Sequence, residues 1–340
     1  MKKIILAFFA LLLSIVLRAG DNGTVPTVAI PSDPTALTMG TVSSYGNSAF
    51  AAENNITAAA YMDSQAELGV SYSLWNIESR SNHIPSIALA YGWGHWGFAL
   101  SVGTYINGSA YTLYDDSGVE NGTFRPFDIK ASIGVAYAFD CGVALGATLR
   151  SVYSKIHPAY KAEVPVGDLY LAYNHKYVGV VLAATNIGAP AKYSKDYGDY
   201  KTRPLAFLPM LIKAGVNVRP VKGLQISVEG DYMLNNNSWM LTAGAQYTIL
   251  DIATLRASYH YGTTAAEFST GSGTGSLSEA GTESAKGYFA SISGVGTAVL
   301  PSYATVGLGF NIKGFTIDAT YLFASPTLKN TVSIALGYRF

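Results

Sequence analysis

Ten charged residues alternate with apolar neighbours along the chain, and this spacing makes them the first candidates for a chemical role. Four are acids and six are bases. Because successive side chains of a β-strand point to opposite faces, the spacing places the charges on the face opposite the apolar residues. There they could select ions in a water-filled interior, or pair with one another across neighbouring strands. The ten residues are Asp128, Lys130, Arg150, Lys213, Arg219, Glu229, Asp231, Arg256, Asp318 and Arg339.

Motifs for catalysis or for phosphate binding do not emerge elsewhere. The histidines are scattered and show neither metal-ligand spacing nor a Ser-His-acid order. The Gly-rich stretch 271–287 lacks the Lys-Ser/Thr ending and the strand–helix frame of a phosphate-binding loop. We therefore expect a non-enzymatic protein with no cofactor or metal site, in which His260 is a hydrogen-bonded residue of a strand. The five histidines are His83, His95, His157, His175 and His260.

The composition argues against an ordinary soluble domain. Charged residues make up 13% of the 340, compared with about 25% in a typical soluble domain. Glycine (35) and tyrosine (24) are abundant. The formal net charge of zero gives no sign of a nucleic-acid partner. Past the N-terminus no apolar run reaches about 18 residues, so we expect no transmembrane helix in the mature protein.

Residues 1–19 have the pattern of a secretory signal peptide. Lys2 and Lys3 precede an apolar stretch at 4–17, and a small-residue cleavage site lies near Ala19. A retained membrane anchor is the alternative. The single cysteine, Cys141, is far from this site. It therefore offers neither an N-terminal lipid anchor nor an intramolecular disulfide.

The alternation of apolar and polar residues predicts fourteen β-strands. At the C-terminus, Val332, Ile334 and Leu336 alternate with small or polar residues, and Phe340 continues the apolar series. The predicted strands are 66–76, 86–93, 96–106, 126–139, 143–155, 166–174, 178–186, 210–219, 224–234, 239–249, 254–261, 304–312, 315–323 and 330–340.

The connections between these strands alternate in length. Short turns are predicted at 94–95, 140–142, 175–177, 220–223, 250–252 and 313–314. Longer loops are predicted at 77–85, 107–125, 156–165, 187–208 and 262–302. This asymmetry is typical of bacterial outer-membrane barrels, with short periplasmic turns and longer external loops. In hydrocarbon, only a closed sheet gives every strand amide a partner. We expect an all-β transmembrane antiparallel barrel over 66–340, with its apolar face in contact with outer-membrane lipid.

The segment 20–65, which precedes the strands, contains two motifs. Ala36, Leu37, Met39 and Gly40 form the first, and the second lies at 60–66, where Asp-Ser-Gln stands in place of Asn-Pro. The layout resembles the PorV/PorQ family of Bacteroidetes, which is similar to FadL-type transporters of hydrophobic compounds. The resemblance implies a 14-stranded barrel with an N-terminal hatch inside its lumen. The segment is small, polar and free of Lys and Arg, which suits a lumen; a disordered periplasmic tail is the alternative.

Two stretches of the external connection 187–208 and its continuation are candidate binding surfaces. Tyrosines offer contact area at low entropic cost, and a partner surface is expected at Tyr193, Tyr197 and Tyr200. An apolar stretch follows them and could line a pocket for a hydrophobic ligand. Its candidate residues are Leu205, Phe207, Leu208 and Leu211.

Three functions remain open for such a barrel. The resemblance implies docking or shuttling in type IX secretion, with secretion-machinery proteins or cargo as partners of the external loops, and this is the leading hypothesis. The alternative is FadL-like transport of hydrophobic small molecules, which needs an apolar pocket and either a lateral opening or a mobile hatch. The third is a structural barrel without cargo or substrate.

Overall fold

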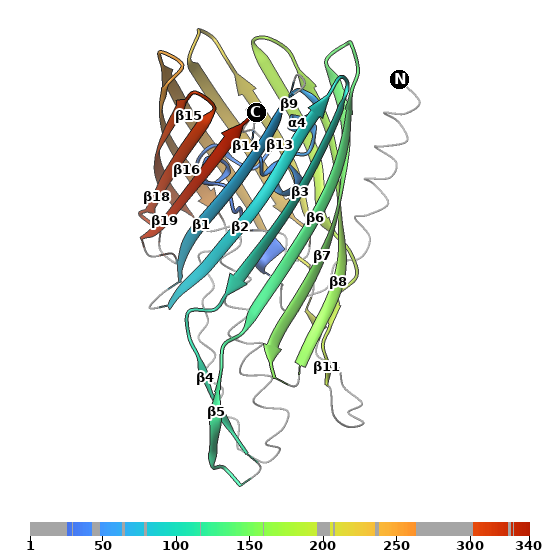
Figure 1. Cartoon of the computed structure of the whole chain (residues 1–340), viewed down its shortest axis with the longest axis vertical. Coiled ribbons are helices and arrows are strands. Elements are labelled where there is room, and N and C mark those ends of the chain that lie inside the picture. Colours follow the sequence, from blue (N-terminus) through green and yellow to red (C-terminus); the bar gives the residue numbers. More distant parts are fainter. Residues whose placement is uncertain are drawn as a thin grey trace.

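The computed structural model describes residues 26–28, 30–42, 48–62, 65–77, 80–115, 117–158, 160–195, 205–206, 208–234, 238–262, 302–325, 328 and 330–340. The predicted signal peptide at 1–19 and the Gly-rich stretch 271–287 lie outside these residues. Within them, fourteen strands form one closed antiparallel sheet (Figure 1). The predicted 14-stranded barrel is therefore confirmed.

The barrel strands follow one another around the wall in chain order, and β19 pairs with β1 to close the ring. They are β1 (Ala66–Ile77), β2 (Arg80–Trp93), β3 (Trp96–Ile106), β6 (Phe127–Ala138), β7 (Val143–His157), β8 (Tyr160–Asn174), β9 (Val178–Ile187), β13 (Leu211–Val218), β14 (Leu224–Met233), β15 (Ser238–Ile249), β16 (Ala253–Gly262), β17 (Tyr303–Ile312), β18 (Phe315–Phe323) and β19 (Thr331–Arg339). Five short strands lie in the connections: β4 (Tyr111–Tyr114), β5 (Glu120–Phe124), β10 (Ala191–Lys192), β11 (Ser194–Lys195) and β12 (Leu205–Ala206).

The two faces of the wall follow the predicted alternation. In β3 the outward Leu100 is 49% exposed, while its neighbours Ala99 and Ser101 are buried in the lumen. The same division holds along β19, and Phe340 points outward at 70% exposure. An apolar exterior on a closed sheet is what a bilayer requires, because hydrocarbon solvates apolar side chains and offers no hydrogen-bond partners.

Two of the predicted long loops are wrong, because the strands beside them extend further. β2 begins at Arg80 rather than near residue 86, and β7 and β8 leave only a short connection at 158–159. Each extension contains a proline, which lacks an N–H and interrupts the apolar pattern. Both prolines nonetheless keep their place in the register, with Pro85 opposite Tyr72 and Pro165 opposite Ser151. The predicted loop 107–125 is largely the hairpin β4–β5, which projects beyond the barrel strands (Figure 1).

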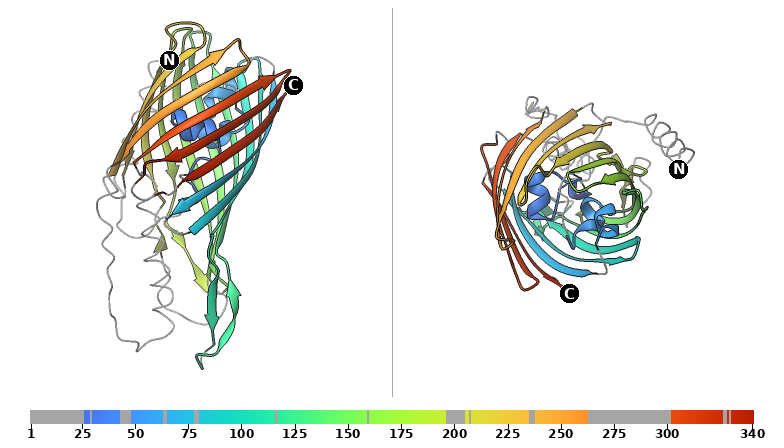
Figure 2. Two further views of the ribbon diagram at one scale, coloured as in Figure 1. Left: turned by 90° about the vertical axis from the view of Figure 1, so that its left-hand side faces the viewer. Right: turned by 90° about the horizontal axis from the view of Figure 1, so that it is seen from above.

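The described residues of 26–62, here called the lumenal segment, lie inside the ring of strands (Figure 2). They form η1 (Pro26–Val28), α2 (Pro34–Met39), α3 (Ala51–Asn54) and α4 (Thr57–Ala60). Asp33 caps α2 by accepting a hydrogen bond from the Thr35 amide, and Gly40 at φ 87° ends it. None of the described helices has the length and apolarity needed to cross a membrane.

Small residues allow the lumenal segment to approach the wall closely. α4 packs against β2, β3 and β6, whereas α2 packs against β15, β16, β17 and β18. A Cβ atom added to Gly97 would overlap the backbone of Ala60. Glycine at this position therefore allows the backbones of the wall and of the lumenal segment to come into direct contact.

Candidate functional site

The lumen has four zones that differ in chemistry. Apolar clusters lie toward the end with the longer connections, which we call the long-loop end, and a further, alanine-rich apolar cluster packs α3 and α4 against the short-turn ends of β2, β3, β6, β7, β8 and β9. A buried polar joint connects the lumenal segment to the wall near the middle. A polar pocket lies at the opposite, short-turn end.

One apolar cluster gathers inward side chains of β7 and β8 with residues from outside those strands. Val152, Val164 and Val166 pack there with Val28 of the lumenal segment and with Leu208 of the connection that follows β9. Two further clusters at the long-loop end surround Leu37 with Trp75 and Tyr303, and Leu211 with Met233 and Met240. The interior of bacterial barrels is ordinarily polar, so these clusters are unusual in a lumen.

The predicted pocket residues do not share one wall. Leu208 and Leu211 are both buried, but they belong to different clusters. The Leu205 side chain and Phe207 lie outside the described residues. A continuous apolar stretch in the sequence thus splits between two packed regions, because β13 begins at Leu211 and turns the chain into the wall.

The expected contact surface at Tyr193 needs correction. The Tyr193 side chain is 2% exposed, and its hydroxyl lies 2.8 Å from Ser154 Oγ, so it packs inside the barrel mouth rather than on an exposed surface. A tyrosine can bury its ring where its hydroxyl finds a partner. Tyr197 and Tyr200 lie outside the described residues.

The apolar cluster that contains Val164 adjoins a seam in the barrel wall. β8 pairs with β9 only from Gly167 onward, and its first two residues pair with β11. Among the described strands, none forms ladder pairs with residues 162–166 on this side of β8. At the seam Asn186 adopts φ 61°, and Asp168 Oδ1 accepts its amide at 2.7 Å. A side chain therefore replaces a ladder partner where the register shifts.

The buried polar joint contains five of the ten predicted inward charges in paired form: Lys130, Arg150, Lys213, Glu229 and Asp231. Arg150 contacts Asp168 at 2.6 Å, and Lys130 contacts Glu53 of α3 at 2.7 Å. Lys213 lies 3.3 Å from Asp231. Asp128 is also buried. The charges thus seal the interior by pairing, which is the second of the two roles considered from the sequence.

Glu229 holds the backbone of the lumenal segment. Its carboxylate accepts the amides of Thr41 at 3.0 Å and Val42 at 2.7 Å, and it also accepts the Thr41 hydroxyl. Charge-assisted bonds of this kind are stronger than neutral ones. This contact and the Lys130–Glu53 pair fasten the segment to opposite strand groups of the wall.

Three acidic partners in the lumen were missed from the sequence: Glu53, Glu67 and Asp168. Asp168 lies two residues from each of the buried Val166 and Tyr170, on the same face of β8, so the strand period could have placed it inward. Glu53 lies in the lumenal segment, where no strand period applies. Its pairing with Lys130 was accessible only from the folded structure.

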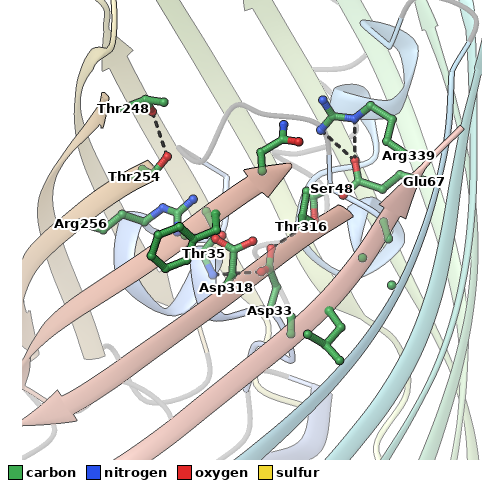
Figure 3. Close-up of a pocket in the computed structure, with 18 of the residues that line it drawn as sticks. Asp33, Thr35, Ser48, Glu67, Thr248, Thr254, Arg256, Thr316, Asp318 and Arg339 are labelled. Atoms are coloured by element: carbon green, nitrogen blue, oxygen red, sulfur yellow. Dashed lines mark hydrogen bonds and ion pairs between the residues drawn. The ribbon is translucent and has the colours of Figure 1, made fainter. Parts of the chain in front are cut away.

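The polar pocket at the short-turn end has a volume of about 270 Å³ (Figure 3). Two ion pairs cross its wall: Arg256 with Asp318 at 2.5 Å, and Arg339 with Glu67 at 3.1 Å. Asp33 reaches the pocket from the lumenal segment, and burial raises its pKa to about 6 despite the hydrogen bond from the Thr35 amide. Arg339, one of the predicted inward charges, thus has a carboxylate partner at the strand end.

His260 is placed as a hydrogen-bonded wall residue. Its Nδ1 lies 2.8 Å from Thr242 Oγ1, its Nε2 lies 3.0 Å from Ser258 Oγ, and its ring stacks on Tyr303. In the part of the chain that the structure describes, no group of three or more His, Cys, Asp or Glu side chains could hold a metal ion.

Comparison with known proteins places this fold among solved outer-membrane transporters. The Ralstonia pickettii toluene transporter TbuX matches with a TM-score of 0.58 and 13% identity, over 90% of this chain and 97% of that one. The Pseudomonas putida toluene transporter TodX gives 0.53 and 12%, over 95% and 98%. A Pseudomonas aeruginosa FadL homologue gives 0.54 and 12%, over 94% and 99%.

Identities this low establish the fold alone, which is that of the FadL-like barrels. The similar structures are transporters or their homologues by name, in agreement with the predicted non-enzymatic class. No family model matches the sequence. No curated protein matches it either. The finer resemblance to the PorV/PorQ family stays a prediction.

Proposed function

We propose that this barrel carries hydrophobic small molecules across the outer membrane. The observation that carries the proposal is the apolar inner face at the long-loop end, where Val152, Val164 and Val166 line the lumen of a fold that is ordinarily polar inside. Ligand sites for apolar molecules are concave and lined mainly by apolar side chains. The solved toluene transporters with the same fold support this reading.

The lumenal segment is proposed to act as a hatch that separates this apolar end from the polar pocket. Val28 and Leu37 belong to apolar clusters, whereas Asp33 reaches the polar pocket, so one segment borders both zones. A hydrophobic solute gains little by entering a pocket lined with two ion pairs. We therefore infer that it leaves sideways, through the seam between β8 and β9, whose unpaired stretch 162–166 adjoins the apolar cluster.

Uptake of radiolabelled toluene by cells that carry the barrel in an intact outer membrane, compared with cells that lack it, tests the proposal. Val164→Thr adds a hydroxyl to the apolar cluster at similar volume. An unpaired buried hydroxyl costs roughly 1–3 kcal/mol, so we expect the uptake rate to fall by about fivefold or more. Val119→Thr, in the exposed turn of the β4–β5 hairpin, is the matched control and should leave uptake unchanged. The proposal is wrong if cells with and without the native barrel take up toluene at the same rate.

Docking in type IX secretion remains a second proposal. The specific observation in its favour is the β4–β5 hairpin, which projects from the long-loop end with Tyr114 67% exposed and Val119 61% exposed. An exposed aromatic on a projecting hairpin suits a partner contact. Deletion of residues 111–124 should abolish co-purification of secretion proteins from outer membranes and leave toluene uptake intact. Unchanged co-purification would remove the hairpin from this role.

A further inference from the structure

A small cavity of about 20 Å³ lies within the buried polar joint, between the lumenal segment and the wall. It is bounded by α3 on one side and by β7, β8 and β9 on the other, through Glu53, Arg150, Tyr170 and Thr185. A cavity needs roughly 10–15 Å³ to hold one water molecule. The space therefore suits one water molecule and is too small for an organic ligand.

Three of these side chains have one buried polar atom without a hydrogen-bond partner in the described structure: Glu53 Oε1, Arg150 Nε and Thr185 Oγ1. The Tyr170 hydroxyl interacts with Asp168 and can still accept a hydrogen bond. The remaining polar atoms of the two charged residues are engaged. Glu53 Oε2 meets Lys130 Nζ and Ser32 Oγ, both at 2.7 Å, and the two terminal nitrogens of Arg150 bond Val28 O, Asn186 Oδ1 and Asp168.

Unpartnered polar atoms at this depth are expensive. Burying a polar group without a hydrogen bond costs about 1–3 kcal/mol on the scale of protein mutations. Three such atoms around one cavity call for an explanation, because most buried polar groups in native folds have a hydrogen-bond partner. Their donor and acceptor types also complement one another: Glu53 Oε1 only accepts, Arg150 Nε only donates, and the Thr185 hydroxyl can do either.

We propose that this cavity is a binding site for a single water molecule that joins the lumenal segment to the wall. The water donates to Glu53 Oε1 and accepts from Arg150 Nε, and the hydroxyls of Tyr170 and Thr185 complete its coordination. This pattern matches the roughly three hydrogen bonds that buried waters usually form. The proposal concerns how the segment is held, and it does not depend on which solute the barrel carries.

The charges around the cavity favour water over an ion. Lys130, Arg150 and Lys213 line it, and they oppose a cation. An anion gains little there, because Lys130, Arg150 and Lys213 already have carboxylate partners and Glu53 Oε1 adjoins the same space. A neutral molecule that both donates and accepts hydrogen bonds is not repelled by either kind of charge.

A high-resolution crystal structure of the full chain tests the site. We expect one spherical density peak within hydrogen-bond distance of both Glu53 Oε1 and Arg150 Nε. In Thr185→Val, which keeps the side-chain volume and removes one hydroxyl, the peak should be lost or weakened. Thr112→Val, in the exposed hairpin, should keep it at full height.

Several results would overturn the proposal. An empty cavity, or direct pairing of Glu53 with Arg150 Nε, would show that no water is bound there. Crystals soaked in rubidium or bromide provide the ion control. An anomalous peak in the cavity would show that the site binds a cation or an anion rather than water. A native-height peak in Thr185→Val would contradict the proposed coordination and so overturn the proposal.

Discussion

Two regions of the lumen, on different sides of the ring and at different ends of it, have opposite chemistry. At the long-loop end the inward positions of β7 and β8 carry Val152, Val164 and Val166, whereas at the short-turn end the inward positions of β1, β16 and β18 carry Glu67, Arg256 and Asp318. The strand period fixes only which residues face inward. The chemical type of the inward residues determines which part of the lumen favours an apolar solute and which part favours water and ions.

A substitution in the buried polar joint should give the largest loss of stability. In Lys130→Met, Glu53 would keep a buried charge without its partner, and breaking a buried pair typically costs about 3–5 kcal/mol. We expect a loss of that size in urea unfolding and faster proteolysis of the lumenal segment. The double variant Lys130→Met with Glu53→Gln should recover part of the loss.

Lys222→Met is the matched control for the joint, since Lys222 pairs with Asp251 at 2.8 Å while both side chains are mostly exposed. Its unfolding curve should coincide with that of the native chain. If Lys130→Met and Lys222→Met lower the free energy of unfolding equally, the buried polar joint contributes no more to stability than an exposed ion pair does.

A pH titration isolates the polar end. Burial raises the pKa of Asp33 to about 6 from an ordinary value of 3.8, so the folded state binds this proton more tightly than the unfolded state does. Stability from this group is therefore full below about pH 4, falls as the pH rises to about 6, and then stays low. The loss is up to about 3 kcal/mol.

Asp33→Asn should remove this part of the pH dependence. Urea midpoints measured for both chains between pH 4 and pH 7 check it, and the difference between the two curves reports Asp33 rather than the other carboxyls. Parallel curves over this range would contradict the assignment.

A substitution that disturbs the close packing of the lumenal segment should cause an intermediate loss of stability. The Cβ atom in Gly97→Ala would overlap the Ala60 backbone and push α4 away from β3. Overpacking of this kind costs about 1–3 kcal/mol, measurable by urea unfolding. Gly230→Ala is the matched control, because nothing lies within 4 Å of its added Cβ. If both variants behave alike, the lumenal segment does not press on the wall at β3.

The smallest effect is expected at the rim of the polar pocket. The Arg339 side chain is 26% exposed beside Glu67, and partly exposed pairs contribute about 0–1 kcal/mol because solvent screens them. Arg339→Gln should therefore lower stability by less than about 1 kcal/mol, and added salt should reduce the difference further. If Arg339→Gln lowers stability as much as Lys130→Met does, the ion pair at the rim contributes as much as the buried pair in the joint.

The strand pattern was sufficient to predict the class of fold and the direction of side chains, but not every boundary. Leu100 faces out and Lys130 faces in as the alternation requires, since the period of two is a local property of the chain. The starts of β2 and β8 were missed, because Pro85 and Pro165 interrupt the pattern while remaining in the ladder.

The site depended more on the tertiary structure. Lys130 was recognisable as an inward charge, but its partner Glu53 lies in the lumenal segment, which has no strand period to reveal it. Tyr193 had the composition of a contact surface, and its burial against Ser154 followed only from how the connection after β9 folds back into the barrel mouth.

By itself the sequence determined that the wall has one face for lipid and one for the lumen, because each strand residue sets its own side. Only the tertiary structure decided which inward residues meet, where β8 leaves β9, and how the lumenal segment joins the wall. Those contacts connect residues far apart in the chain, so no local spacing encodes them.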